Sequence, residues 1–329
     1  MARLHVLAAR AAMIDFRYHV VSIIAVFLAL GTGIVLGSTA LDRPIIDDLK
    51  RRTEGLAADK AELQDTVEEL GRDVDASEEF AVAAARLVLP GRLTGQRVVV
   101  ISAPDASKEV RDSLVTTVRQ AGGRVTAQVR LLPRLVDPAA AAEIEDLLPE
   151  VATGITPPAG TVAHAAAELA AALDTEGAPD AEEAPTKTVR LISAFREAGL
   201  LAADGPSVLP GDLVLMVLAT AEESADDEQE AVRDLRTKAM LAVVSSFAGR
   251  GAVVLAAPVD GAEDGSLLAA VRDDAALAAR LSSVDFAGEP AGNIATVLAL
   301  ADAARREFGH YGRGPGAEAP LPALEPAPA

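Results

Sequence analysis

The sequence predicts an α/β protein: a three-layer domain of the Rossmann or flavodoxin type with a mostly parallel sheet, preceded by one transmembrane helix and one coiled-coil helix. Three observations predict this fold class. Near its N-terminus the chain has a long uncharged segment, which is followed by leucines at every seventh position and then by short apolar runs that alternate with helical segments. We therefore divide the chain into an N-terminal cytoplasmic segment (residues 1–19), the transmembrane helix (20–41), the coiled-coil helix (42–90), the extracytoplasmic α/β domain (91–312) and a disordered Pro-rich tail (313–329).

The predicted transmembrane helix rests on twenty-two residues without a formal charge between His19 and Asp42. A bilayer core about 30 Å thick requires roughly 20 apolar residues of helix, because the backbone polar groups must be satisfied within the segment. A secretory signal peptide is the alternative interpretation, since arginines precede the run and Ser-Thr-Ala at 38–40 offers a cleavage site. The run exceeds the roughly 7–15 apolar residues of a signal, which favours a retained anchor.

Charges on both sides of this segment do not decide its orientation. Arginines precede it, and Arg43, Lys50, Arg51 and Arg52 follow it. Long domains are translocated largely regardless of such charges. We expect a single-pass protein whose large domain lies outside the cytoplasm, anchored in the cell membrane or in an outer membrane of the envelope.

Three glycines in the span predict close packing of membrane helices. They are Gly31, Gly33 and Gly37, and the last two have the small-xxx-small spacing. Small residues let two helix backbones approach closely, so we expect this face to contact a second copy of the chain.

A heptad pattern follows the span and predicts the coiled-coil helix. Its two apolar columns contain Ile46, Leu49, Leu56, Leu63, Val67 and Leu70. The polar Lys60 in one column would bias the register at a cost in stability, and Gly71 weakens the helix locally. The alternative is a single amphipathic helix packed on its own domain. Together with the glycines, the pattern favours a homodimer or larger homo-oligomer.

Short apolar runs beyond residue 97 predict the strands of the domain. Continuous runs typical of strands covered on both faces lie at 98–101, 213–218 and 253–257. Residues 124–131 alternate as in a strand with one buried face, and a last strand is expected near 284–287. Helices are expected between and after these strands, over residues 107–121, 223–248, 266–273 and 293–308.

A helical insertion is predicted between the second and third strands. Helices are expected over residues 138–150, 160–173 and 187–201. Residues 175–186 are acidic and rich in Pro and Ala, which predicts a mobile loop. The prolines of residues 313–329 predict a disordered or polyproline-II tail.

Composition excludes several function classes. The net charge of −19 argues against a nucleic-acid partner, which would require clustered Lys and Arg. The absence of cysteine excludes disulfides, thiolate metal sites and thiol nucleophiles. Phosphate-binding glycine loops, the G-x-S-x-G elbow and the H-E-x-x-H helix are also missing. We therefore predict no catalytic residues and no cofactor.

The sequence also predicts a candidate ligand crevice at one edge of the sheet. Asp105, Glu222 and Asp260 follow three of the predicted strands, where open parallel sheets bind ligands. A small-molecule enzyme or sensor built on this crevice is the least favoured function.

Both ends of the chain resemble one known family. Residues 14–22 (Ile-Asp-Phe-Arg-Tyr-His-Val-Val-Ser) with 23–38 resemble the start of the mycobacterial copper transport protein (MctB) family. Residues 282–285 (Ser-Ser-Val-Asp), 292–301 and 309–312 (Gly-His-Tyr-Gly) are similar to its C-terminal end. The order of span, coiled coil and α/β domain also agrees, so the resemblance covers nearly the whole chain.

The resemblance implies an actinobacterial envelope protein associated with copper export or resistance. The family is proposed to form outer-membrane pores, and members have been linked to cell-division scaffolds. The resemblance also suggests Met13 as an alternative start to Met1, because family members tend to begin just before the first motif.

The residues themselves predict no dedicated copper site. Cu(I) prefers clustered Cys or Met, and Cu(II) prefers clustered imidazoles. The Met and His residues are scattered in the sequence: Met1, Met13, Met216, Met240, His5, His19, His164 and His310. Met216 and Met240 lie in apolar segments and are expected to fill the core. A pore also requires several copies, because one apolar helix has no polar face to line a channel and no strands have the barrel pattern.

Two hypotheses about the function therefore remain to be tested. The first is a membrane-anchored protein of the MctB type that takes part in copper transport, efflux or homeostasis through an oligomer. The alternative is a non-enzymatic coiled-coil scaffold that binds a protein partner in the envelope or the cell-division machinery.

Overall fold

A computed structural model describes the backbone of residues 2–174, 185–205, 208–220, 227–259, 261–263 and 265–323. Side chains are described for the same residues except 2–15, 38–48 and 227–229. Residues 175–184 of the predicted acidic loop therefore lie outside the described part, as do Glu222 and Asp260. The chain divides into two compact units, Met1–Asp75 and Ala76–Ala329.

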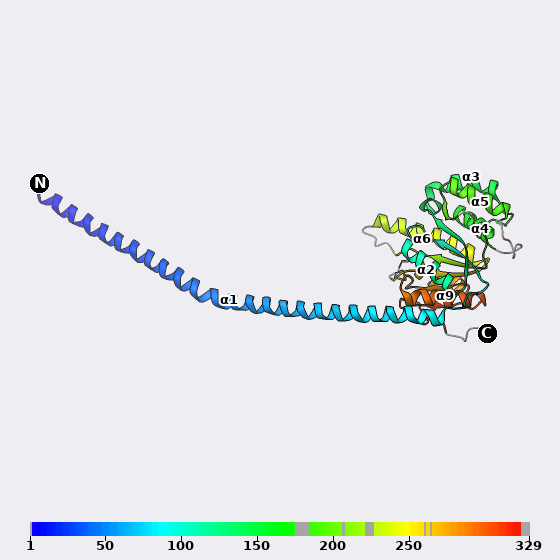
Figure 1. The fold of residues 1–329 in the computed structure, drawn as a ribbon. Coiled ribbons are helices and arrows are strands. Elements are labelled where there is room, and N and C mark those ends of the chain that lie inside the picture. Colours follow the sequence, from blue (N-terminus) through cyan, green and yellow to red (C-terminus); the bar gives the residue numbers. More distant parts are fainter. Residues whose placement is uncertain are drawn as a thin grey trace. The chain divides into compact units, whose positions relative to one another are not determined.

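The first unit consists of one helix. Helix α1 runs from Ala2 to Val88, so the two helices expected on either side of residue 41 are continuous (Figure 1). The single Gly71 does not break it, because one glycine costs only about 1 kcal/mol in a long helix. Within α1, Phe16–Gly37 has a mean hydropathy of 2.5 and none of it is buried. This stretch is long and apolar enough to cross a membrane.

The second unit is built on a seven-stranded sheet in the order β3-β2-β1-β4-β5-β6-β7. The strands are β1 (Arg97–Ser102), β2 (Arg124–Leu131), β3 (Leu201–Asp204), β4 (Leu213–Val217), β5 (Ala252–Ala256), β6 (Ser282–Val284) and β7 (His310–Tyr311). All neighbours are parallel except β2 and β3. Without the antiparallel edge strand β3, the order is that of the flavodoxin type. The predicted α/β class with a mostly parallel sheet is confirmed.

The central strands form where the continuous apolar runs predicted them. Every residue of β4 and β5 is buried, as expected of strands covered on both faces. Val99, Val214 and Val253 are aligned across β1, β4 and β5. Their branched side chains pack on the pleated surface and fix the register at the centre of the sheet.

Helices cover both faces of the sheet, giving the three predicted layers (Figure 1). One face packs against α2 (Lys108–Gln120), α9 (Pro290–Ala304) and the last turns of α1, which contribute Ala81. The other face packs against η1 (Pro133–Val136), η2 (Pro138–Ala140), α3 (Ala141–Val151), α4 (Thr161–Leu173), α5 (Thr186–Glu197), α6 (Asp227–Ala248) and α7 (Leu267–Asp273). The short α8 (Ala275–Ala278) leads into β6.

The structure corrects the predicted helix over 187–201. Helix α5 ends at Glu197, and Gly199 turns the chain with a φ of +69°. Residues Leu201–Asp204 then form the edge strand β3, antiparallel to β2. A glycine adopts positive φ without a Cβ clash, so it ends the helix and starts the strand.

The C-terminal part also differs from the prediction. The last predicted strand, at 284–287, lies earlier, at Ser282–Val284, and a further strand, β7, follows α9. The predicted disordered tail is wrong for residues 313–323. Ala319 accepts a hydrogen bond from the backbone N–H of Gly312 at 2.9 Å, and Pro322 is buried. Residues 324–329 lie outside the described part.

Candidate functional site

The heptad face of α1 is exposed along its length. The predicted residues Leu49, Leu56, Leu63, Val67 and Leu70 are between 58% and 71% exposed. The side chain of Ile46 lies outside the described part. Burying one such aliphatic side chain is worth about 1.5–3 kcal/mol. The face therefore has the pattern and the exposed apolar area that association with another helix requires.

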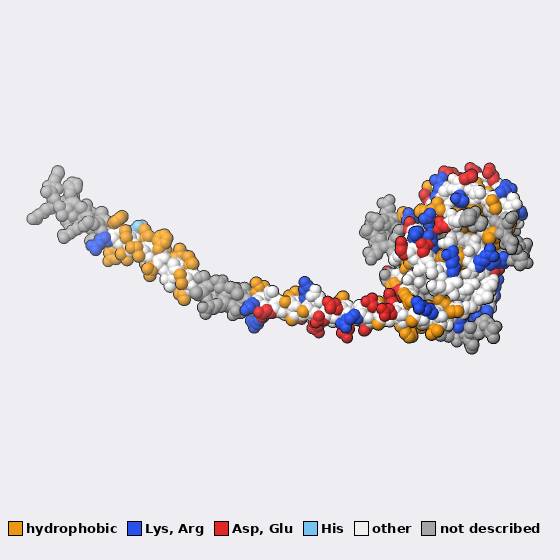
Figure 2. All heavy atoms as spheres, viewed as in Figure 1, with side chains coloured by type: hydrophobic (Ala, Val, Ile, Leu, Met, Phe, Trp, Pro, Cys, Tyr) orange, Lys and Arg blue, Asp and Glu red, His pale blue; other side chains and the backbone are white. Residues whose placement is uncertain are grey.

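The apolar stretch Phe16–Gly37 contains the three predicted glycines. Figure 2 shows hydrophobic side chains gathered along this stretch, followed by mixed acidic and basic side chains along the rest of the helix. A Cβ placed on Gly31, Gly33 or Gly37 would meet no atom within 4 Å. The three glycines thus leave a side of the helix without side-chain bulk, which is what close packing of two membrane helices requires.

The two C-terminal sequence motifs meet as the neighbouring strands β6 and β7. Ser283 is aligned with His310, and Val284 with Tyr311. The Ser283 hydroxyl lies 2.8 Å from Nδ1 of His310. Both motifs are visible in the sequence, but their contact is not, because the paired positions are twenty-seven residues apart.

A buried ion pair connects these strands to residues 313–315, which follow β7. Nη1 of Arg272 lies 2.9 Å from Oδ2 of Asp285, and the two side chains are 3% and 2% exposed. Arg272 also donates to the Ser283 hydroxyl and to the carbonyls of Tyr311 and Pro315, at 3.0, 3.0 and 2.8 Å. One guanidinium thus joins α7, β6, β7 and the C-terminal segment.

The Asp285 carboxylate completes this buried cluster. It accepts hydrogen bonds from the backbone N–H groups of Arg313 and Gly314 at 2.8 and 3.0 Å. Gly312 lies against it with a φ of +144°, and a Cβ there would overlap the carboxylate. The glycine is therefore required by close approach as well as by backbone conformation.

This cluster lies buried inside the domain. Ser283, His310 and an aspartate resemble the residue types of a hydrolase triad, but Ser283 is fully buried within a strand. Burial lowers the pKa of His310, and Arg272 adds to this effect, while Glu318 and a hydrogen bond with the Ala278 backbone oppose it. The imidazole is therefore held neutral inside the domain.

A crevice lies at the carboxyl ends of the central strands. Its volume is about 240 Å³. Asp105 lines it, as the sequence predicts, with a φ of +63° in the turn after β1. Arg233 and Arg236 of α6 also line it and were missed by the sequence analysis. Their i, i+3 spacing, which places them on one side of a helix, was the available signal.

The described residues contain no group of three or more His, Asp or Glu side chains that could hold a metal ion. His164 and Glu168 form a pair, with Nε2 and Oε1 3.6 Å apart. Met216 and Met240 are buried in the core, as predicted, and Met240 also borders the crevice. Both side chains are packed among the apolar residues of that core.

Comparisons with known proteins agree over nearly the whole chain. The family described as copper transport outer membrane protein, MctB, matches residues 13–322. Proteins named copper transporter MctB from Mycobacterium tuberculosis and Mycobacterium bovis are 31% identical over 315 residues, covering 93% of this chain and 98% of theirs. The protein of that name from Mycobacterium leprae is 29% identical over 337 residues, with the same coverage.

Proposed function

We propose that this chain, which belongs to the MctB family of copper transport proteins, acts in copper transport or homeostasis as a membrane-anchored assembly of several copies. The observation that carries the proposal is the match over residues 13–322, which includes the span, the heptad helix and the α/β domain. Relatives that align with 93% of this chain are named copper transporters. The family is one of transport proteins, and we propose no enzymatic activity.

The assembly is proposed from two exposed faces on α1. The heptad face offers a coiled-coil seam, and the glycine face of the span offers a close contact between membrane helices. Both faces lie on the same continuous helix, so one pairing can use both. A homodimer is the smallest assembly that covers them.

Several copies are also what transport requires of this chain. A single apolar helix satisfies its own backbone but presents no polar path through the bilayer. We propose no dedicated copper site within one chain, because the described residues contain no group of three or more His, Asp or Glu side chains and the sequence has no cysteine. We therefore propose that copper passes through, or is controlled by, the assembly.

The anchor is proposed to be retained, with the domain outside the cytoplasm. The stretch Phe16–Gly37 contains 22 residues, more than the roughly 7–15 of a signal-peptide core. Protease treatment of intact cells should degrade the domain, and the mature chain should still contain the span and resist carbonate extraction. A chain that begins after Ala40, or that washes off the membrane, would contradict this part.

The copper function is tested by complementation. The full chain should restore growth on copper and normal cell-associated copper to a mycobacterial strain that lacks its own MctB. The double variant Leu56→Lys/Leu63→Lys, which places two charges in the heptad face, should fail although the protein is present in the membrane. Unchanged copper sensitivity and copper content with the intact chain would overturn the proposal.

The matched control is Ala58→Lys/Ala61→Lys. It adds the same charge to the same part of α1 at positions outside the heptad columns, and both residues are exposed. Alanine and lysine are both good helix formers, so the helix is kept. This control should restore copper tolerance like the unmodified chain.

A scaffold is the second candidate, favoured by the same exposed heptad face. In this case the face binds a helix of another envelope or division protein rather than a second copy. Cross-linking in membranes followed by purification distinguishes the two. A stable protein partner that is lost in Leu56→Lys/Leu63→Lys supports the scaffold, and recovery of the chain alone contradicts it.

A further inference from the structure

The crevice lies at a position where sheets of this type bind ligands. Strand order reverses between β1 and β4, because the chain continues from β1 to β2 on one side and later adds β4 on the other. Ala103, Pro104 and Asp105 follow β1, and Leu218, Ala219 and Thr220 follow β4; all six line the crevice. Open α/β sheets bind their ligands outside the carboxyl ends of the strands at such a switch point.

Arg233 is the least exposed of the charged residues that line this crevice. Its Nε atom is buried and has no hydrogen-bond partner among the described residues. Within the described part of the chain, Nη2 of Arg233 forms an ion pair with Oε1 of Glu230 that is 3.6 Å long, and that glutamate side chain is 60% exposed. A buried guanidinium N–H without an acceptor costs free energy, so its presence calls for an acceptor that the described residues do not supply.

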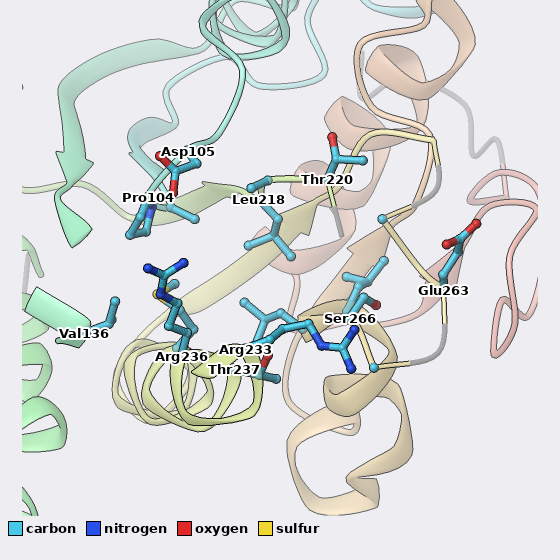
Figure 3. Close-up of a pocket in the computed structure, with 17 residues that line it drawn as sticks. Pro104, Asp105, Val136, Leu218, Thr220, Arg233, Arg236, Thr237, Glu263 and Ser266 are labelled. Atoms are coloured by element: carbon cyan, nitrogen blue, oxygen red, sulfur yellow. The ribbon is translucent and has the colours of Figure 1, made fainter. Parts of the chain in front are cut away.

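The surrounding loop leaves room for the guanidinium. Gly265 has a φ of +81°, and a Cβ there would lie 3.4 Å from Nη2 of Arg233. Figure 3 shows Arg233 extending from α6 toward Ser266, while Arg236 extends toward Pro104 and Asp105. The two basic side chains therefore border different parts of one space.

The rest of the lining is apolar with a few hydroxyl groups. Apolar side chains come from Ala103, Val136, Leu218, Met240, Leu267 and Leu268, and hydroxyls from Thr220, Thr237 and Ser266. Such a combination of apolar walls and a few polar groups is typical of small-ligand sites. The acidic residues Asp105 and Glu263 are both exposed at the rim, where water screens their charge. The half-buried Arg233 is screened less, so the interior favours negative charge.

We propose that this crevice binds a small organic anion whose carboxylate or phosphate group accepts hydrogen bonds from the Arg233 guanidinium. A planar guanidinium matches both oxyanions in a two-bond geometry. The apolar walls contact the rest of the ligand. With a volume of about 240 Å³, the crevice limits the ligand to a small molecule. The site does not depend on the proposed role in copper transport.

Isothermal titration of the full chain in detergent tests this site. Inorganic phosphate and succinate are titrated separately, and the one that binds identifies the oxyanion. One of them should bind at one site per chain. The variant Arg233→Gln should weaken binding by about 10- to 100-fold, the loss expected for a hydrogen bond to a charged group. The control Arg119→Gln removes the same charge from an exposed position on α2 and should bind like the unmodified chain.

A second variant keeps the test valid if Arg233→Gln unfolds. Arg236 is exposed on α6, so Arg236→Gln should fold normally and weaken binding several-fold through the lost positive charge. Binding of neither anion by the unmodified chain would overturn the proposal. Equal binding by the unmodified chain, Arg233→Gln and Arg236→Gln would also overturn it, because the anion would then lie elsewhere.

Discussion

Replacing Asp285 by alanine should destabilise the α/β domain more than any surface ion-pair substitution. The change leaves the charge of Arg272 without its counterion, and that side chain is only 3% exposed. Removing one partner of a buried pair costs about 3–5 kcal/mol. The backbone N–H groups of Arg313 and Gly314 lose their acceptor too, but Arg313 is exposed and water can replace the carboxylate there. We therefore expect the free energy of unfolding to fall by about 3–5 kcal/mol, a large part of the roughly 5–15 kcal/mol of a typical domain.

Urea denaturation of the full chain in detergent measures this loss. Tyr311 lies in β7 beside the ion pair, so the near-ultraviolet circular dichroism of tyrosine reports unfolding there. The other tyrosine, Tyr18, lies in the membrane-spanning stretch and should not change. Lys108→Ala is the control, because the Lys108–Asp112 pair is 73% and 47% exposed and should contribute less than about 1 kcal/mol.

A double variant separates the ion pair from general damage to the fold. Asp285→Ala/Arg272→Ala removes both charges, so no unpaired buried charge remains. Its loss of stability should be smaller than the sum of the two single losses. If Asp285→Ala costs no more than Lys108→Ala, the C-terminal segment is not held by this pair and the reasoning is refuted.

The remaining predictions concern protonation, close approach and the span. Stability should fall as the pH drops through about 6.5, because an unfolded His protonates near its ordinary pKa of about 6.5 while burial lowers the pKa of folded His310. In the variant His310→Asn the urea midpoint should depend less on pH, and an unchanged pH dependence would contradict the assignment to His310. Hydrogen bonds lower the pKa values of Glu109 and Asp112, so these two carboxyl groups affect stability only at more acidic pH. Gly312→Ala should lower the urea midpoint markedly, since its Cβ would overlap the Asp285 carboxylate, whereas Gly154→Ala has open space and should show only the cost of its positive φ. Gly33→Ile should reduce disulfide-independent cross-linking between copies in membranes, and equal cross-linking would show that the glycine face is not a contact.

The centre of the fold was predictable because its signals are local. Fully buried parallel strands need continuous apolar residues, and β1, β4 and β5 lie where those runs occur. Strands β3 and β7 were missed because they have only four and two residues. Their pairing is made by tertiary contacts with β2 and β6, which no short sequence window reveals.

The C-terminal segment shows how tertiary contacts override composition. Its prolines predict an extended, disordered tail. Arg272, more than forty residues earlier, binds the carbonyl of Pro315 and thereby places the segment on the domain. Proline lacks a backbone N–H but keeps its carbonyl as an acceptor, so a Pro-rich segment can still be held by a donor from elsewhere.

Only some of the residues that line the candidate crevice were predicted from the sequence. Asp105 was found because polar residues after parallel strands meet at one edge of the sheet. The arginines of α6 were missed because charged residues on a long helix normally face solvent. Only the packing of α6 against the strands shows that Arg233 faces the crevice.

The mass of the intact chain in detergent, measured by light scattering on a size-exclusion column, tests the assembly most directly. We predict a dimer or a larger assembly for the unmodified chain and for Ala58→Lys/Ala61→Lys, and a monomer for Leu56→Lys/Leu63→Lys. A monomeric unmodified chain would contradict the account, because neither the heptad face nor the glycine face would then join two copies.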